Sequence, residues 1–190
     1  NKLGISSATI SNNLRRPDHW KDVSDELWMK IGGKLGYRFR NKDWYVVDTE
    51  NYGIMREAMR IAQEERMFIA ISESSGSGKS SAIKRYKAAD TTDSVYVLEC
   101  GNWGRQRFLV HLANCLGIKL ETERLSSEVI GDRVVGALQK KATTGEPLVI
   151  LDQANSLRPT ALTWLIHLYN KLEGEIGVVV CGTEHLKDSI

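Results

Sequence analysis

One stretch of this sequence constrains the fold more than any other: an apolar run that gives way to small residues and ends in Gly-Lys-Ser. Residues 69–71 are Ile-Ala-Ile, residues 74–78 are Ser-Ser-Gly-Ser-Gly, and Lys79 and Ser80 follow directly. The next residues, to about Ala88, are predicted to be helical. A buried strand, a glycine-rich loop and a helix in this order form a cradle for phosphate groups, because consecutive backbone N–H groups of the loop converge on an anion.

Each residue type in this loop has a chemical role in binding a nucleotide. The ammonium group of Lys79 can reach the β- and γ-phosphates, and the hydroxyl of Ser80 can ligate Mg²⁺. Glu73 departs from the G-x-x-x-x-G-K-[ST] pattern, since it stands where glycine permits a tight turn and it brings a carboxylate near the phosphates. The alternative is a surface loop rich in serine and glycine that contains Gly-Lys-Ser by chance. The predicted nucleotide-binding residues are Ser74, Ser75, Gly76, Ser77, Gly78, Lys79, Ser80 and Ser81.

A second apolar strand ends in an acidic residue. Residues 148–151 are Leu-Val-Ile-Leu, and Asp152 follows where a Mg²⁺-binding carboxylate is expected beside the loop. The next position usually carries a glutamate that orients or deprotonates the attacking water, and here it is Gln153. An amide can hydrogen-bond to water but cannot accept a proton, so we expect binding to survive and hydrolysis to be slow. The alternative for Asp152 is a capping residue at the end of a core strand.

A third apolar strand, over residues 178–181, leads into Gly182 and Thr183. At this place the Thr183 hydroxyl could reach the γ-phosphate or the attacking water. It could equally cap a helix that begins at Glu184. Both roles stay open.

Helical and strand-like segments alternate from Thr49 onward. Strands separated by helices form a parallel sheet with helices on both faces, so we predict an α/β fold built around the phosphate-binding loop. Helices are predicted over 50–65, from the loop to about 88, and over 104–116, 126–142 and 159–173; strands are predicted over 67–72, 94–99, 148–152 and 177–181.

Residues 1–36 differ from the rest and are predicted to form a small all-α unit, with residues 37–48 as a linker. A helix end, a turn at Gly4 and a second helix through Leu14 resemble the turn and recognition helix of a helix-turn-helix unit. A third helix is predicted from Ser24 to Gly36. The alternative is a helical hairpin that packs on a neighbour. On the first interpretation the residues that contact DNA are Ser7, Thr9, Ser11, Asn12, Arg15 and Arg16.

Composition excludes several classes of protein. Residues 1–48 carry nine Lys/Arg against six Asp/Glu, whereas residues 49–190 carry 17 against 18, so the first segment is the basic one. Three widely spaced cysteines without metal-ligand spacing indicate buried thiols in a reducing compartment. Since the sequence shows neither a membrane-spanning run nor a signal peptide, we expect a soluble cytoplasmic protein. Both ends interrupt helical patterns, which indicates a segment of a longer protein.

With these motifs, residues 49–190 resemble the core of an AAA+ ATPase. Together with the helix-turn-helix-like unit, the chain resembles the transposition target-selection ATPases, the family of the phage Mu B protein. Residues 151–157, Leu-Asp-Gln-Ala-Asn-Ser-Leu, stand where such proteins usually have D-E-A-[DN]-x-L. The resemblance implies ATP and Mg²⁺ as cofactors. It gives Asp152 the metal position, Gln153 the position of the catalytic glutamate and Thr183 that of sensor 1. The arginine finger, the second sensor and the C-terminal lid of such proteins are expected beyond residue 190.

The same resemblance implies an ATP-dependent, largely non-sequence-specific DNA-binding oligomer or filament. Such a protein selects target DNA, recruits or stimulates a transposase, and is released when ATP is hydrolysed. DNA contacts in the core are predicted at Arg105 and Arg107, with Lys140 and Lys141 as a poorer second pair. Two other interpretations stay open: a replicative helicase loader with the same core, and a helix-turn-helix regulator that only senses nucleotide.

Overall fold

A computed structural model of the protein describes residues 27, 28, 32, 33, 49–120, 125–184 and 186. The chain divides into two compact units, Asn1–Val46 and Val47–Ile190. In the first unit the four described residues are helical and belong to the predicted third helix. The residues predicted to contact DNA in this unit, Ser7, Thr9, Ser11, Asn12, Arg15 and Arg16, lie outside the described residues.

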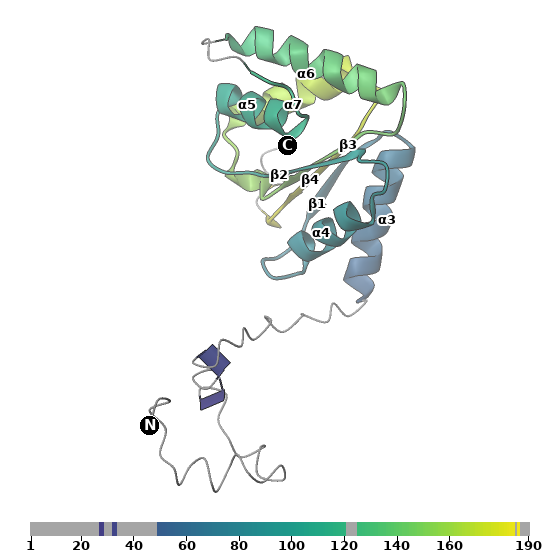
Figure 1. Ribbon diagram of the computed structural model, residues 1–190, viewed down its shortest axis with the longest axis vertical. Coiled ribbons are helices and arrows are strands. Elements are labelled where there is room, and N and C mark those ends of the chain that lie inside the picture. Colours follow the sequence, from purple (N-terminus) through teal and green to yellow (C-terminus); the bar gives the residue numbers. More distant parts are fainter. Residues whose placement is uncertain (1–26, 29–31, 34–48, 121–124, 185, 187–190) are drawn as a thin grey trace, which may run out of the picture. The chain divides into compact units, whose positions relative to one another are not determined.

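The second unit alternates helices and strands as the sequence predicts (Figure 1). Every helix and strand predicted from residue 49 onward is present, with ends that differ from the prediction by at most two residues. A short 3₁₀ turn, η3, was not predicted. The elements are α3 (Glu50–Glu64), β1 (Phe68–Ser72), α4 (Lys79–Ala89), β2 (Val95–Glu99), α5 (Arg105–Cys115), α6 (Ser127–Ala142), β3 (Leu148–Asp152), η3 (Ala154–Ser156), α7 (Pro159–Lys171) and β4 (Gly177–Gly182).

The four strands form one parallel sheet in the order β1-β4-β3-β2. The two central strands, β3 and β4, are buried along their whole length, which explains why their sequences are continuously apolar. The edge strands β1 and β2 keep partly exposed positions. The predicted α/β fold with a parallel sheet is therefore confirmed.

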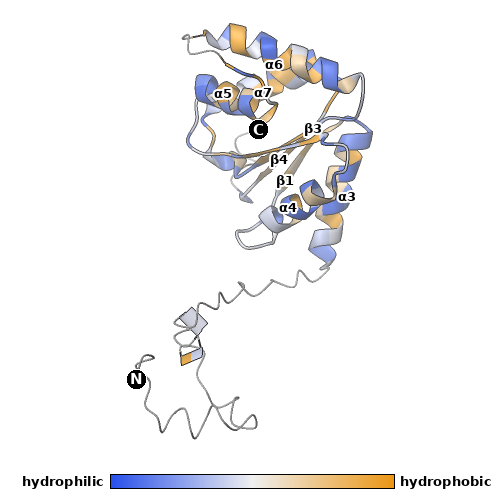
Figure 2. Ribbon diagram, viewed as in Figure 1, coloured by the Kyte–Doolittle hydropathy of each residue, from blue (hydrophilic) through white to orange (hydrophobic). Residues whose placement is uncertain are grey.

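Helices cover both faces of the sheet, so the unit has three layers (Figure 1). One core joins alternate strand residues to α5, α6 and α7, and the other joins the remaining strand residues to α3 and α4. Figure 2 shows hydrophobic and hydrophilic residues alternating along α3 and α6, the pattern of helices that bury one face. None of the helices in the described part of the chain has the length and apolarity that a membrane crossing needs.

The order of the strands determines where the functional side chains meet. β4 lies between β1 and β3, and all strands run parallel, so their carboxyl ends share one edge of the sheet. The loop after β1, the residue after β3 and the residue after β4 are thereby neighbours. In open parallel sheets, ligands bind at this edge where the strand order reverses.

Candidate nucleotide-binding site

The loop between β1 and α4 uses its two glycines for backbone conformations that other residues rarely adopt. Gly76 has φ 84° and Gly78 has φ 90°, both in the left-handed region. Gly78 also caps α4, and it does so without a side chain, so the backbone N–H groups of the first turn stay accessible to a ligand. The loop therefore ends on the positive end of a helix dipole, as a phosphate site requires.

Glu73 fits this loop without the left-handed conformation that would demand glycine. Among the described non-glycine residues, positive φ values occur only at Arg66, Asp93 and Gln153. The Glu73 N–H donates to the Gly182 carbonyl at 3.3 Å and so extends the pairing of β1 with β4. Its side chain is exposed and does not line the cavity described below. The left-handed conformations of this loop thus occur at Gly76 and Gly78, so a glutamate can stand at position 73.

The Lys79 side chain folds back over the loop. Its ammonium group donates to the carbonyl oxygens of Glu73 and Ser74, each at 2.8 Å, and to the Ser77 hydroxyl at 3.0 Å. These bonds brace the loop and place a positive charge directly over it. Phosphate oxygens compete well for such an ammonium group, because charge-assisted hydrogen bonds are stronger than bonds to neutral carbonyls.

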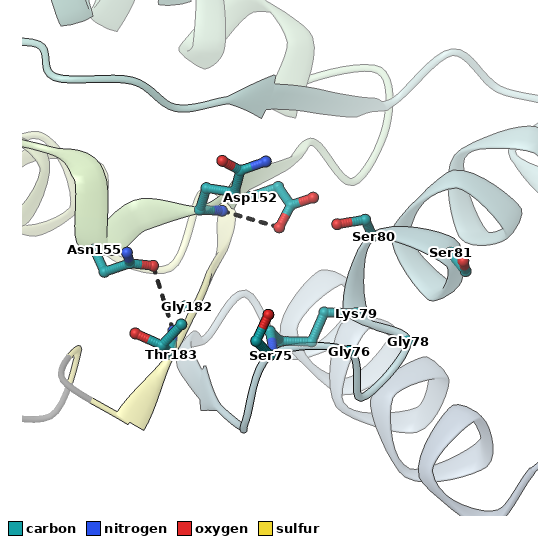
Figure 3. A pocket seen from close by; sticks show the side chains of 11 residues that line it. Ser75, Gly76, Gly78, Lys79, Ser80, Ser81, Asp152, Asn155, Gly182 and Thr183 are labelled. Carbon is teal, nitrogen blue, oxygen red and sulfur yellow. Dashed lines mark hydrogen bonds between the residues drawn. The ribbon is translucent and has the colours of Figure 1, made fainter.

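A cavity of about 560 Å³ opens between the loop and the carboxyl ends of β3 and β4 (Figure 3). It brings together residues from three separate motifs of the sequence. Of the eight predicted loop residues, Ser74 and Ser77 do not line it and instead hold the Lys79 ammonium group. The lining residues are Ser75, Gly76, Gly78, Lys79, Ser80, Ser81, Asp152, Gln153, Asn155, Gly182 and Thr183.

Two oxygen groups face each other across this cavity. In Figure 3 the Ser80 hydroxyl points toward the carboxylate of Asp152, which is 8% exposed. One hydroxyl and one carboxylate fit Mg²⁺, which takes few protein ligands and completes its shell with water and phosphate oxygens. In the part of the chain that the structure describes, no group of three or more His, Cys, Asp or Glu residues could hold a metal ion. One hydroxyl and one carboxylate leave most of the coordination shell to water and phosphate oxygens, which suits Mg²⁺ bound together with a nucleotide.

Gln153 has a strained backbone and a side-chain hydrogen bond to the neighbouring strand. Its φ of 56° and ψ of 37° are left-handed, a conformation that costs a residue other than glycine on the order of 1 kcal/mol. The Asp152 carboxylate accepts the Gln153 N–H at 2.9 Å, and the side-chain amide donates to Glu99 at 3.1 Å. Strain that the surroundings hold in place is common at functional sites.

The end of β4 is tied to the turn after β3. The Thr183 N–H donates to the Asn155 side-chain oxygen at 3.3 Å, and the Thr183 carbonyl accepts from the Ser72 hydroxyl at 3.1 Å. Thr183 also precedes a short 3₁₀ turn, where its carbonyl accepts the Leu186 N–H at 2.9 Å. Asn155 also lines the cavity, although the sequence predicted no role for it.

The two basic pairs predicted to contact DNA lie at opposite ends of the strands, one near their carboxyl ends and the other near their amino ends. Arg105 and Arg107 are exposed at the start of α5, directly after the carboxyl end of β2, and thus on the nucleotide side. Lys140 and Lys141 end α6 before β3 begins, at the other edge. Lys141 is also half-buried, with its ammonium group 4.8 Å from the centre of the Tyr96 ring.

A third arginine, which the sequence did not predict to contact DNA, lies against the segment that leads to the first pair. The Arg158 Nε donates to the Asn102 side-chain oxygen at 2.9 Å, and the Arg158 N–H donates to the Trp103 carbonyl at 2.9 Å. The exposed Arg158 therefore packs against the segment that leads into α5. We call Arg105, Arg107 and Arg158 the basic cluster.

The first turn of α5 contains no acidic residue, so its arginines face the positive end of the helix dipole. This arrangement costs a few tenths of a kcal/mol per charge and favours an anionic partner. Arg105 is paired with Glu128 at 2.9 Å, and both side chains are exposed. Water screens such an exposed ion pair, so Arg105 can exchange this partner for a phosphate.

Comparison with known proteins identifies the family. A model of the AAA domain family matches residues 62–190, about two thirds of the chain. This chain belongs to the AAA domain family. The matched segment of the AAA domain includes every cavity-lining residue, and membership implies nucleotide binding.

The AAA domain also has a counterpart among solved structures. The crystal structure of Cdc6p from Pyrobaculum aerophilum is similar with a TM-score of 0.58 and 16% sequence identity over 76% of this chain. The match covers 42% of the Cdc6p chain, and at this identity it shows the fold alone. No curated protein matches the sequence.

Proposed function

We propose that this AAA-type ATPase binds ATP in the cavity and assembles on DNA in response. The observation that carries the nucleotide part is the single cavity that joins Lys79 to Asp152, because it unites a phosphate-binding loop with a metal-binding carboxylate. A loop with both glycines in left-handed conformations at the start of a helix supports the same assignment.

The residues around the cavity divide the chemistry of ATP hydrolysis among them. The loop N–H groups and Lys79 bind the phosphates. Ser80 and Asp152 would hold Mg²⁺, which would supply positive charge against the charge that develops on the phosphate oxygens. Gln153 and Thr183 contact the attacking water. Because an amide cannot accept the water's proton, turnover is slow and the ATP-bound state is long-lived.

The basic cluster supplies the DNA-binding surface of the core. Arginines on the nucleotide side of the sheet contact phosphate groups of the duplex, which explains binding that is largely independent of sequence. Arg107→Gln should weaken DNA binding and reduce the slope of log K against log salt by about 0.9. Lys140→Gln, at the opposite edge, is the matched control and should leave both quantities near wild type. Equal effects of the two substitutions would reject this surface.

The role in transposition extends the proposal beyond the cavity. It rests on the resemblance of the motifs and of the N-terminal unit to the target-selection ATPases, in which an ATP-bound filament on DNA recruits a transposase. ATP between subunits would stabilise the filament, and hydrolysis would release it.

Electron microscopy of the protein on random-sequence DNA tests this proposal. We expect filaments with ATP and none with ADP. Binding to a replicative helicase without filaments would favour a helicase loader instead. Tight binding to one operator sequence, unaffected by ATP, would favour a nucleotide-sensing regulator.

A further inference from the structure

A groove of about 380 Å³ lies between α3 and α4, on the face of the sheet opposite to α5, α6 and α7 (Figure 1). Its lining includes four residues of α3 whose spacing of three or four positions puts them on one side of the helix: Tyr52, Arg56, Arg60 and Gln63. The groove reaches Val95, the first residue of β2. None of the described residues that line it also lines the nucleotide cavity, so it is a separate surface.

Positive charge predominates in this groove. Three arginines line it, Arg56, Arg60 and Arg85. Its acidic residues are Glu57 and Asp90, and both already have partners. The Glu57 carboxylate pairs with Arg60 at 2.6 Å, and the Asp90 carboxylate accepts two backbone N–H groups at 2.9 and 3.0 Å. Arg56 is exposed, and among the described residues it makes no hydrogen bond or ion pair. The groove therefore suits an anionic ligand.

Two tyrosines line the same groove, and a contact holds each of their rings in place. The Arg85 guanidinium lies 4.2 Å from the centre of the Tyr52 ring. The Tyr86 hydroxyl donates to the Gln63 side-chain oxygen at 2.7 Å. Both tyrosines are half-buried, so part of each side chain stays accessible. Aromatic rings beside arginines provide surfaces on which the bases of a nucleic acid stack.

This combination of groups distinguishes among anionic partners. A peptide partner needs a pocket that buries an apolar or aromatic anchor. Apart from the tyrosines, the apolar residues in the described lining are Ala89 and Val95, and Val95 is only 1% exposed. A DNA duplex keeps its bases stacked inside, so it would contact the arginines and leave the tyrosines unused. A single strand uses both, because it presents phosphates and unstacked bases together.

We propose that this groove binds single-stranded nucleic acid, with a phosphate on Arg56 and bases stacked on Tyr52 and Tyr86. The site is distinct from the basic cluster, whose arginines lie at the starts of α5 and α7. Binding in the groove does not require ATP, since its lining residues are not those of the nucleotide cavity. Single strands of DNA and of RNA share this chemistry, so both serve as probes.

Fluorescence anisotropy of a labelled oligothymidylate, without nucleotide, tests the groove. Arg56→Gln should weaken binding about three- to tenfold and reduce the slope of log K against log salt by about 0.7, the share of one phosphate contact on a single strand. Tyr52→Leu should weaken binding about fivefold or more and leave that slope unchanged. Arg133→Gln, an equal change of charge at an exposed position of α6, is the matched control and should bind as wild type. An oligouridylate should respond to the same substitutions, and the tighter of the two probes identifies the source of the strand.

Photo-crosslinking locates the bound strand independently of affinity. An oligonucleotide that carries 5-iodouracil should crosslink to Tyr52 or Tyr86, as mass spectrometry of the digested protein would show. Binding of a DNA duplex should be near wild type in Tyr52→Leu, and thermal unfolding should show that each variant is folded. Single-strand affinities of Arg56→Gln and Tyr52→Leu that equal those of wild type, or an equal loss in Arg133→Gln, would overturn the inference. Crosslinks confined to α5, α6 or α7 would overturn it as well, and the nucleotide cavity would keep its assignment in either case.

Discussion

Removal of the Lys79 ammonium group should separate nucleotide binding from folding. The group makes three hydrogen bonds within the loop, at 2.8, 2.8 and 3.0 Å, and we expect it to exchange them for oxygens of the β- and γ-phosphates. Two charged hydrogen bonds are worth about 3–6 kcal/mol, and the loop bonds given up offset part of that. Lys79→Ala should therefore cost about 2–4 kcal/mol of ATP binding, which raises Kd roughly 30- to 700-fold.

Titration with a fluorescent ATP analogue measures this loss directly. Lys84→Ala is the matched control, since Lys84 is exposed on the same helix and its removal changes the net charge equally. ADP lacks the γ-phosphate, so its Kd should rise less than that of ATP. Thermal unfolding without nucleotide should distinguish lost binding from a collapsed loop, and we expect Tm to change little because the loop is largely exposed.

Assembly on DNA provides the second measurement of this prediction. If ATP acts as the assembly switch, Lys79→Ala should form no filaments on random-sequence DNA at ATP concentrations that saturate the wild type. Lys84→Ala should form them normally. An ATP affinity within threefold of wild type would refute the role of Lys79 at the phosphates, and normal filaments despite lost ATP binding would refute the switch.

The remaining predictions concern stability and the thiols. A Cβ at Gly177 would lie 2.2 Å from a backbone carbonyl oxygen of α3, so Gly177→Ala should destabilise by about 1–3 kcal/mol. Gly136→Ala, on the exposed side of α6 with nothing within 4 Å of the new Cβ, should stabilise by about 0.5–1 kcal/mol. Urea unfolding should therefore show a lower free energy of unfolding for Gly177→Ala and a higher one for Gly136→Ala than for the wild type. Burial, with a smaller contribution from the Asp152 carboxylate, raises the pKa of the Cys100 and Cys181 thiols to about 12, so a thiol reagent at pH 8 should leave both unmodified in the native protein. The native state then keeps protons that the unfolded chain releases above about pH 9, so the free energy of unfolding should fall as the pH rises from about 9 toward 12.

The parts of the fold that sequence predicts are those fixed by local pattern. Residues 148–152 form a fully buried strand because every side chain is apolar up to the terminal acid, and the loop glycines take left-handed conformations that a Gly-x-Gly-Lys pattern anticipates. Strand order has no such local signal. The insertion of β4 between β1 and β3 depends on long-range packing, yet it is what brings Thr183 into the same cavity as Lys79 and Asp152.

The contacts that sequence could not predict join residues distant in the chain. Arg158 precedes a proline at the start of α7, and nothing in that local pattern shows that it lies against Asn102 and Trp103. The bond between Glu99 and Gln153 requires β2 and β3 to be neighbours in the observed register. That register depends on how the whole sheet packs, so the local sequence around neither residue indicates the contact.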